Sequence, residues 1–297
     1  MSAVAGAGQP ATPAAPVADE ERRAQRERWA LLRRSKTFVA GAVILGVFLI
    51  CAVFGELLAP DDPFATDPLN DLAAPSSDHW FGTDRVGRDV LSRVIVGARD
   101  IMLVAPAATL LGTVLGTILG LVTGYYRGAV DDVLSRIIDA FLAIPVVILA
   151  MLTITGLGPS NLTIIFVIGL VFAPVIARTV RAAVLQEVGM EYVAAARLRN
   201  ERTSYVLFAE ILPNVMGPVL VEFTVRLGYA IFTVATLSFL GFGIQPPAPD
   251  WGVQVFEHYG LISGGYWWPV LFPSIAIAIL VVGVNLVADG IAKAFER

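Results

Sequence analysis

Cysteine, histidine and lysine are nearly absent from this sequence of 297 residues. The single cysteine, Cys51, excludes an intrachain disulfide and a cysteine-based metal site. The two histidines, His79 and His258, are too few and too far apart in sequence to indicate a metal cluster. Neither lysine, Lys36 nor Lys293, fits the pattern Gly-x4-Gly-Lys-[Ser/Thr] that binds nucleotide phosphates. We therefore expect no metal site, no cofactor and no ATPase activity in this chain.

Charged residues are also scarce, at 15% of the sequence, whereas 56% of the residues are hydrophobic. Soluble domains average about 25% charged and about 45–50% apolar residues. A water-soluble fold of this size cannot bury so much apolar surface, so the composition predicts a membrane protein. The formal net charge of −4 argues against nucleic acid as a partner.

Six charge-poor segments are long enough to cross a bilayer, which takes about 20 residues at about 1.5 Å per residue. The first is residues 37–58. The others are residues 101–126, 137–156, 162–184, 215–242 and 266–288. In the second segment Gly112, Gly116 and Gly120 recur every four residues, which predicts a close-packing helix face. The predicted fold class is an all-α polytopic membrane protein with six transmembrane helices.

The distribution of basic residues predicts the orientation. Most of the 21 lysines and arginines fall in the N-terminal tail and in segments on the same side of the membrane. The opposite side holds Arg85, Arg88, Arg93 and Arg99. The positive-inside rule therefore places both termini in the cytoplasm. Residues 1–36 form a partly disordered tail whose basic end either lies on the membrane surface or is a solvated collar, and residues 290–297 form the cytoplasmic C-terminus.

Two connections are longer than their neighbouring spans require. Residues 59–100 form an extracytoplasmic loop, and Val90, Val94 and Ile95 in its second half share one helical face. This pattern predicts a helix that rests on the membrane surface. On the other side, residues 185–213 form a polar stretch of about two short helices, and long loops of this kind usually bind a partner.

The stretch Glu191–Asn200 reads EYVAAARLRN and is followed by Ile211-Leu212-Pro213-Asn214. It resembles the EAA loop of bacterial ABC importer permeases, in which short helices dock into a groove on the ATPase subunit. Small alanine side chains permit close docking, and an asparagine where the family has glycine still tolerates a left-handed helix cap. The family's first acidic residue falls on Ala194, and Glu191 lies one turn earlier on a similar face. The resemblance implies an ATPase-coupling loop that includes Glu191, Tyr192, Ala195, Ala196, Arg197 and Asn200.

Further motifs resemble the C-type permease of oligopeptide, dipeptide and nickel ABC importers. They are Gly82-Thr83-Asp84, Gly87–Arg93, Gly124-Tyr125-Tyr126, Ser238–Pro247, Asp250-Trp251-Gly252 and Asn285–Gly290. The resemblance covers roughly residues 37–292 and implies a type I importer permease in the bacterial cytoplasmic (inner) membrane. Its MetI-like core, residues 101–289, would contain helices two to six.

The resemblance also implies the partners and the role of the chain. A homologous permease subunit would complete a heterodimer around the translocation pathway. Two ABC ATPase subunits would bind ATP and Mg²⁺, and an extracellular or periplasmic substrate-binding protein would deliver the solute. The chain itself would be a non-catalytic transport subunit.

Two more sets of residues are candidate sites. Glu222 and Arg226 are spaced i,i+4 within the fifth span, where charges usually face a bundle interior or a watery cavity. They either line the pathway or lock helix packing, and the sequence leaves both open. Candidate contacts with the binding protein lie in the outer loop 243–265, whose alternative role is a stiff connector. They are Pro246, Pro247, Asp250 and Trp251.

Other functions remain as alternatives. Within the family, the solute is a di- or oligopeptide, or else nickel or another small solute. An ion-coupled secondary transporter would be expected to carry buried acids or broken helices in two matching halves, and the sequence shows no such repeat. A membrane-embedded enzyme would need clustered histidines, cysteines or acids, which the sequence lacks.

Overall fold

A computed structural model describes Leu32 and residues 35–295. Most of the predicted N-terminal tail, residues 1–36, lies outside the described residues, as do residues 296–297. Regular secondary structure in the described part is helical, apart from an isolated β-bridge between Thr83 and Asp89. The predicted all-α fold class is confirmed.

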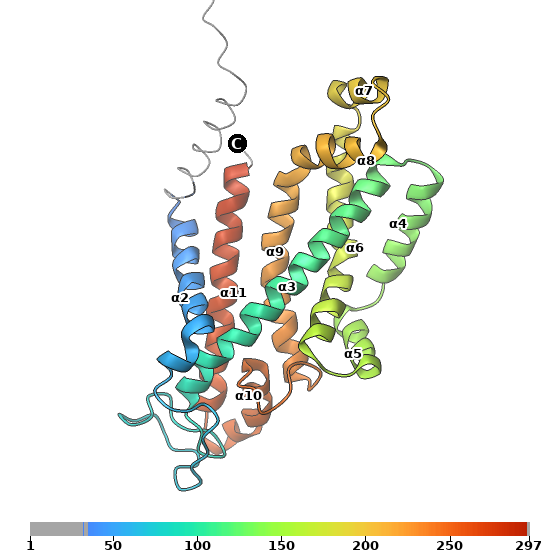
Figure 1. Cartoon of the computed structure of the whole chain (residues 1–297). Coiled ribbons are helices and arrows are strands. Elements are labelled where there is room, and N and C mark those ends of the chain that lie inside the picture. Colours follow the sequence, from blue (N-terminus) through green and yellow to red (C-terminus); the bar gives the residue numbers. More distant parts are fainter. Residues whose placement is uncertain (1–31, 33–34, 296–297) are drawn as a thin grey trace, which may run out of the picture.

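Five long helices form the body of the molecule (Figure 1). They are α2 (Lys36–Leu58), α3 (Val90–Tyr125), α6 (Asn161–Glu187), α9 (Leu212–Phe239) and α11 (Trp268–Phe295). Each is long and apolar enough to cross a membrane, α9 together with the short helices before it. Helix α3 runs obliquely across the bundle and contacts α2, α6, α9 and α11 (Figure 1).

The third predicted span is broken. Residues 137–156 do not form one straight helix but divide between α4 (Ala129–Leu142) and α5 (Val146–Leu157), which are bent by 87°. Pro145 lies at the break as the N-cap of α5. Its ring disfavours helical backbone at the preceding residue and it has no N–H to donate, so a helix is interrupted there. The described residues therefore contain six spans if the bent pair is one of them.

The expected surface helix is instead the beginning of α3. Helix α3 starts at Val90 and continues without a break to Tyr125, because the adjacent charged residues Arg99 and Asp100 do not end a helix. Asp89 caps its N-terminus by accepting hydrogen bonds from the backbone N–H and the hydroxyl of Ser92, both at 2.7 Å. Residues 59–89 form the remainder of the long connection, at the α10 end of the molecule (Figure 1).

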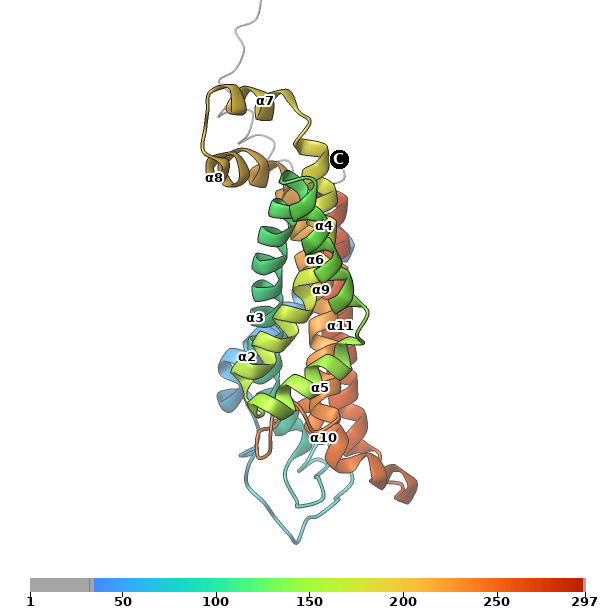
Figure 2. The ribbon, with the colours of Figure 1, turned by 90° about the vertical axis from the view of Figure 1, so that its right-hand side faces the viewer.

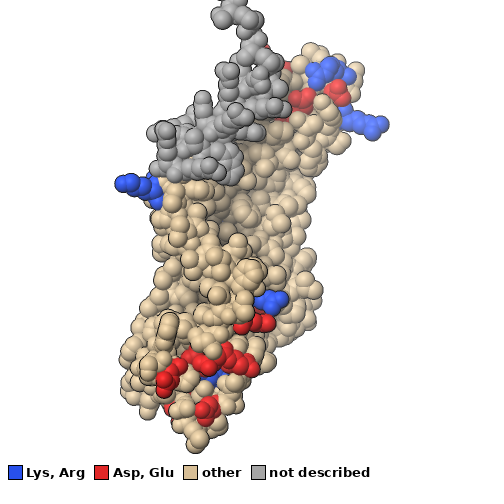
Figure 3. Space-filling model, turned by 60° about the vertical axis from the view of Figure 1, so that its left-hand side comes forward, with Lys and Arg blue, Asp and Glu red and all other residues tan. Residues whose placement is uncertain are grey.

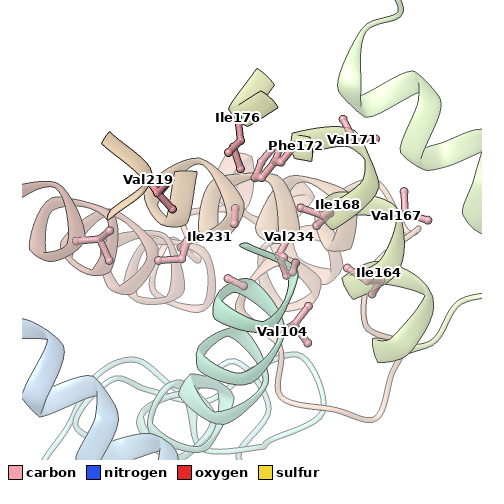
Figure 4. Close-up of a cluster of buried hydrophobic side chains, with 14 of the residues drawn as sticks. Val104, Ile164, Val167, Ile168, Val171, Phe172, Ile176, Val219, Ile231 and Val234 are labelled. Carbon is pink, nitrogen blue, oxygen red and sulfur yellow. The ribbon is translucent and has the colours of Figure 1, made fainter. Parts of the chain in front are cut away.

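Helices α3 and α6 pack most extensively, and glycines allow their close approach. A Cβ atom at Gly116 would lie 2.7 Å from the carbonyl oxygen of Ala173, and one at Gly120 would lie 2.8 Å from that of Ala177. The predicted close-packing face of α3 is thus confirmed. Side chains of α3, α6 and α9 fill the adjoining core, with Val104, Ile168 and Val234 among those in Figure 4.

Helix α4 is tied to α6 by two ion pairs and exposes an apolar face. Asp131 accepts two hydrogen bonds from Arg181 of α6, at 2.7 and 2.6 Å, and Asp139 accepts one from Arg178 at 2.9 Å. The apolar face exposes Val130, Val133, Ile137 and Phe141. This arrangement would be unfavourable in water but suits lipid or a neighbouring apolar subunit. Uncharged side chains likewise cover the middle of the face shown in Figure 3, and acidic side chains gather near its lower end.

Candidate coupling and pathway sites

The predicted coupling loop projects from one end of the molecule (Figure 2). It contains α7 (Glu191–Leu198), α8 (Thr203–Tyr205) and the π-helical segment η1 (Val206–Ile211). Val193 and Ala196 are fully buried on the side of α7 that packs against η1. The remaining side of α7 is open, and Leu198 is 85% exposed there. This side of α7 is therefore not covered by any other described part of the chain.

The end of α7 has the geometry predicted for it. Asn200 adopts a φ of 55°, the left-handed conformation expected of the residue that replaces glycine. The N–H of Glu201 donates to the carbonyl of Ala196 at 3.2 Å, and the N–H of Asn200 donates to that of Arg197 at 3.0 Å. These two bonds form a Schellman motif, so α7 ends sharply and its position relative to α8 is fixed.

Side chains of α7 connect the loop to the long helices. The guanidinium of Arg197 lies over the ring of Tyr125 at the end of α3, 4.8 Å from its centroid. The hydroxyl of Tyr192 donates to Glu187 at the end of α6 at 2.7 Å. Burial, followed by this bond to a carboxylate, raises the pKa of Tyr192 to about 12, so the phenol stays protonated and remains a donor. A displacement of α7 would therefore act on α3 and α6.

The predicted coupling residues divide between two environments. Glu191, Ala195, Arg197 and Asn200 are exposed, whereas Ala196 is buried inside the loop and Tyr192 is half-buried. Sequence reasoning missed the π-helical segment that joins α8 to α9. Its signal is Pro213, which has no N–H for the carbonyl four residues earlier, so the regular hydrogen-bond pattern cannot continue through this turn.

Glu222 and Arg226 form a half-buried ion pair within α9. The Nε of Arg226 donates to Oε2 of Glu222 at 2.9 Å, and the hydroxyl of Thr179 on α6 donates to Oε1 of Glu222 at 2.7 Å. Glu222 therefore joins α9 to α6 while it neutralises Arg226. The guanidinium also lies over the ring of Tyr229, 5.3 Å from its centroid. Both roles predicted for the pair, packing and pathway, are compatible with this geometry.

The structure divides the four candidates in loop 243–265. Pro246 and Pro247 are exposed, but Asp250 and Trp251 are 0% and 1% exposed. Asp250 caps α10 (Trp251–His258) by accepting from the N–H of Val253 at 2.9 Å, and the indole N–H of Trp251 donates to the carbonyl of Val94 at 2.9 Å. In this conformation Asp250 caps α10 and Trp251 holds α10 against α3, so neither offers a surface to a binding protein.

The α10 end also holds an ionic network that the sequence did not reveal. The guanidinium of Arg88 lies 2.6 Å from the carboxylate of Asp84 and 3.2 Å from that of Glu257 on α10. Arg88 therefore ties loop 59–89 to α10. Nearby, Nδ1 of His79 lies 3.1 Å from Asp89 and 3.7 Å from Asp61. The oxygens of Asp89 already accept from Ser92 and His79, so these residues close the loop onto the start of α3. The absence of a metal site stays a prediction.

Comparison with known proteins identifies the family. A family model described as binding-protein-dependent transport system inner membrane component matches residues 116–297. This chain belongs to that family. A second model, the N-terminal TM domain of oligopeptide transport permease C, matches residues 26–75 of the permease.

Relatives of the permease match it over most of its length. The dipeptide transport system permease protein DppC of Alkalihalophilus pseudofirmus is 36% identical, over 91% of this chain and 89% of that protein. The di/tripeptide permease DppC of Pseudomonas aeruginosa is 33% identical, over 91% of each chain. The glutathione permease GsiD of Escherichia coli is 34% identical, over 94% of this chain and 92% of that protein.

A solved structure shows the fold. The inward-facing MetNI methionine ABC transporter matches with a TM-score of 0.56 and 21% identity, over 69% of the permease and 97% of that chain. The predicted family, the MetI-like fold and the role as a transport subunit are thereby confirmed. The assignment of individual coupling and pathway residues stays a prediction.

Proposed function

We propose that the permease forms one half of the translocation pathway of an ATP-driven importer of di- or oligopeptides. The relatives reported above are named as permeases for dipeptides, for di- and tripeptides, or for glutathione. These names favour peptides over nickel or another small solute. Membership of a binding-protein-dependent family disfavours the ion-coupled secondary transporter.

The remaining subunits follow from the same proposal. A homologous permease completes the pathway as a heterodimer, two ABC ATPase subunits bind ATP and Mg²⁺, and an external binding protein delivers the peptide. The permease crosses the bacterial inner membrane several times with both termini in the cytoplasm, so the α7 end is cytoplasmic and the α10 end is outside. The surplus of basic residues on the α7 side supports this orientation.

In the proposed mechanism, α7 is the element that the ATPase grips. Closure of the ATPases on ATP displaces α7, and its contacts carry that displacement to the spans. Arg197 transmits it to α3 through Tyr125, and Tyr192 transmits it to α6 through Glu187. Since α3 and α6 are closely packed, they move together, and the pathway alternates between inward-open and outward-open states.

The observation that supports this role most directly is the open face of α7, with Glu191 and the strongly exposed Leu198 at the tip of a polar insert. We expect Glu191→Arg or Leu198→Asp to abolish peptide-stimulated ATP hydrolysis while membrane insertion is retained. Asp132→Arg, which reverses the charge at an exposed position of α4 outside the coupling loop, is the matched control. Normal stimulation in both α7 variants would refute the docking assignment.

A further inference from the structure

An exposed aromatic stripe runs along the outer half of α9. It consists of Tyr229, Phe232 and Phe239, of which Tyr229 is 57% and Phe232 is 62% exposed. Their spacing of three and seven positions places the three rings on one side of the helix. The three exposed aromatic side chains therefore form a row that runs along the membrane normal.

The outer end of the stripe opens into a cluster of aromatic rings. The ring of Phe239 lies edge-on to Phe256 of α10 and to Tyr259 of η2 (Tyr259–Gly264), with centroid distances of 6.3 and 6.1 Å. All three rings remain exposed. The stripe therefore begins at the outer face of the molecule, where a solute would arrive.

The inner end of the stripe meets the intramembrane ion pair. Tyr229 lies under the guanidinium of Arg226, which in turn pairs with Glu222. Hydrocarbon solvates a charged group poorly, and intramembrane charges face a protein interior or a watery cavity. Because Tyr229 and Arg226 are in contact, the inner end of the stripe shares its surroundings with this charged pair. Lipid is therefore an unfavourable environment for the inner end of the stripe.

We propose that the aromatic stripe is the wall that the permease contributes to the translocation pathway, and that its occupant is an extended peptide. This inference rests on the proposed function and assigns residues to it. Aromatic rings contact apolar side chains of many shapes, so such a wall accepts peptides of many sequences and does not select a single one. The half-buried ion pair of Glu222 and Arg226 keeps the inner end of the stripe polar, which suits the charged terminus of a peptide better than hydrocarbon does.

The dimensions of the stripe fit this occupant. At about 1.5 Å per helical residue, Arg226 and Phe239 are separated by about 20 Å along α9. An extended peptide covers about 3.4 Å per residue, so a chain of about six residues spans this distance. A di- or tripeptide would therefore pass from the outer rings to the ion pair in two or three overlapping positions.

Cysteine accessibility in the complete transporter tests the stripe. Cys51 is the one native cysteine, so Cys51→Ser provides a background free of thiols in this subunit. In that background Phe232→Cys and the control Phe166→Cys are treated with a charged, membrane-impermeant methanethiosulfonate in native membranes. Phe166 is an aromatic residue of α6 that is 51% exposed and lies outside the stripe. Thiols react as thiolates, which form only where water reaches them.

We expect the cysteine at 232 to react at least about tenfold faster than the one at 166, because the proposed pathway brings water to the stripe and Phe166 lies outside the stripe. A supplied tripeptide of alanine or phenylalanine should slow the reaction at 232. No reaction at 232 would overturn the proposal, since the stripe would then face lipid or the second permease. Reaction without protection by either peptide would overturn the peptide as its occupant.

Uptake measurements separate this inference from the proposed function. Phe232→Ala should lower uptake of the phenylalanine tripeptide about fivefold, the effect of losing one aromatic contact, with the subunits recovered in normal amounts. Phe166→Ala should leave uptake unchanged. Loss of the assembled complex in Phe232→Ala would instead assign the stripe to the subunit interface. A wild-type transporter that takes up no peptide would refute the proposed function itself, whatever the labelling shows.

Discussion

Gly116 lies where α3 and α6 are closest, and adding one methyl group there should destabilise the permease. The Cβ atom of alanine would lie 2.7 Å from the carbonyl oxygen of Ala173 and 2.7 Å from Cβ of Ile176. Carbon atoms prefer separations of about 3.5–4.0 Å, so the helices must move apart by roughly 1 Å. Overpacking of this kind costs about 1–3 kcal/mol. For a chain of this size the temperature of unfolding should fall by about 2–5 °C.

Gly46→Ala on α2 is the matched control, because no atom lies within 4 Å of the Cβ that it would add. Both variants introduce the same methyl group into an apolar helix. Thermal unfolding of the purified transporter in detergent, followed by the loss of monodisperse complex, compares them directly. Equal unfolding temperatures for Gly116→Ala and Gly46→Ala would refute the close packing of α3 on α6.

Three further predictions concern the coupling loop and the outer loop. Tyr192→Phe removes the hydrogen bond to Glu187 at a cost of about 1 kcal/mol, so peptide-stimulated ATP hydrolysis should fall while subunit recovery stays normal. Asn200→Gly should preserve resistance of the loop to proteolysis, whereas Asn200→Ala should lower it, because alanine in the left-handed conformation costs about 1–2 kcal/mol. Burial raises the pKa of Asp250 from 3.8 to about 6, so its contribution to stability is present below pH 3.8 and is lost as the pH rises through about 6. The wild type should therefore unfold at a higher temperature at pH 5 than at pH 7.5, and Asp250→Asn should remove most of this difference; an unchanged difference would contradict the assignment.

Hydropathy predicted most of the fold because lipid imposes a simple condition on the spans. Charge-poor segments of sufficient length became α2, α6 and α11 with small shifts of their ends. The third span was predicted as one helix although Pro145 lies within it, and the structure breaks there. The start of α3 was placed too late, because charge was given more weight than the capping motif at Asp89.

The candidate sites were predicted unevenly for a related reason. The left-handed Asn200 follows from local backbone preference, so the sequence alone sufficed. The burial of Asp250 and Trp251 depends on their contacts with α10 and α3, which are tertiary. The sequence did contain one signal, since Asp250 directly precedes a helix and is a favoured N-cap residue. The pairing of His79 with Asp89 and the bond between Thr179 and Glu222 join elements whose packing no local pattern specifies.

The most direct test of the account is whether α7 contacts an ATPase subunit. In the Cys51→Ser background, Leu198→Cys places a thiol at the exposed tip of α7 in the reconstituted transporter. In the reconstituted transporter, a short bifunctional thiol reagent should join this residue to a cysteine in the surface groove of the ATPase. In sealed cells, an impermeant thiol reagent added outside should not label the cysteine at 198. Labelling from outside, with no cross-link to the ATPase, would contradict both the orientation and the coupling role.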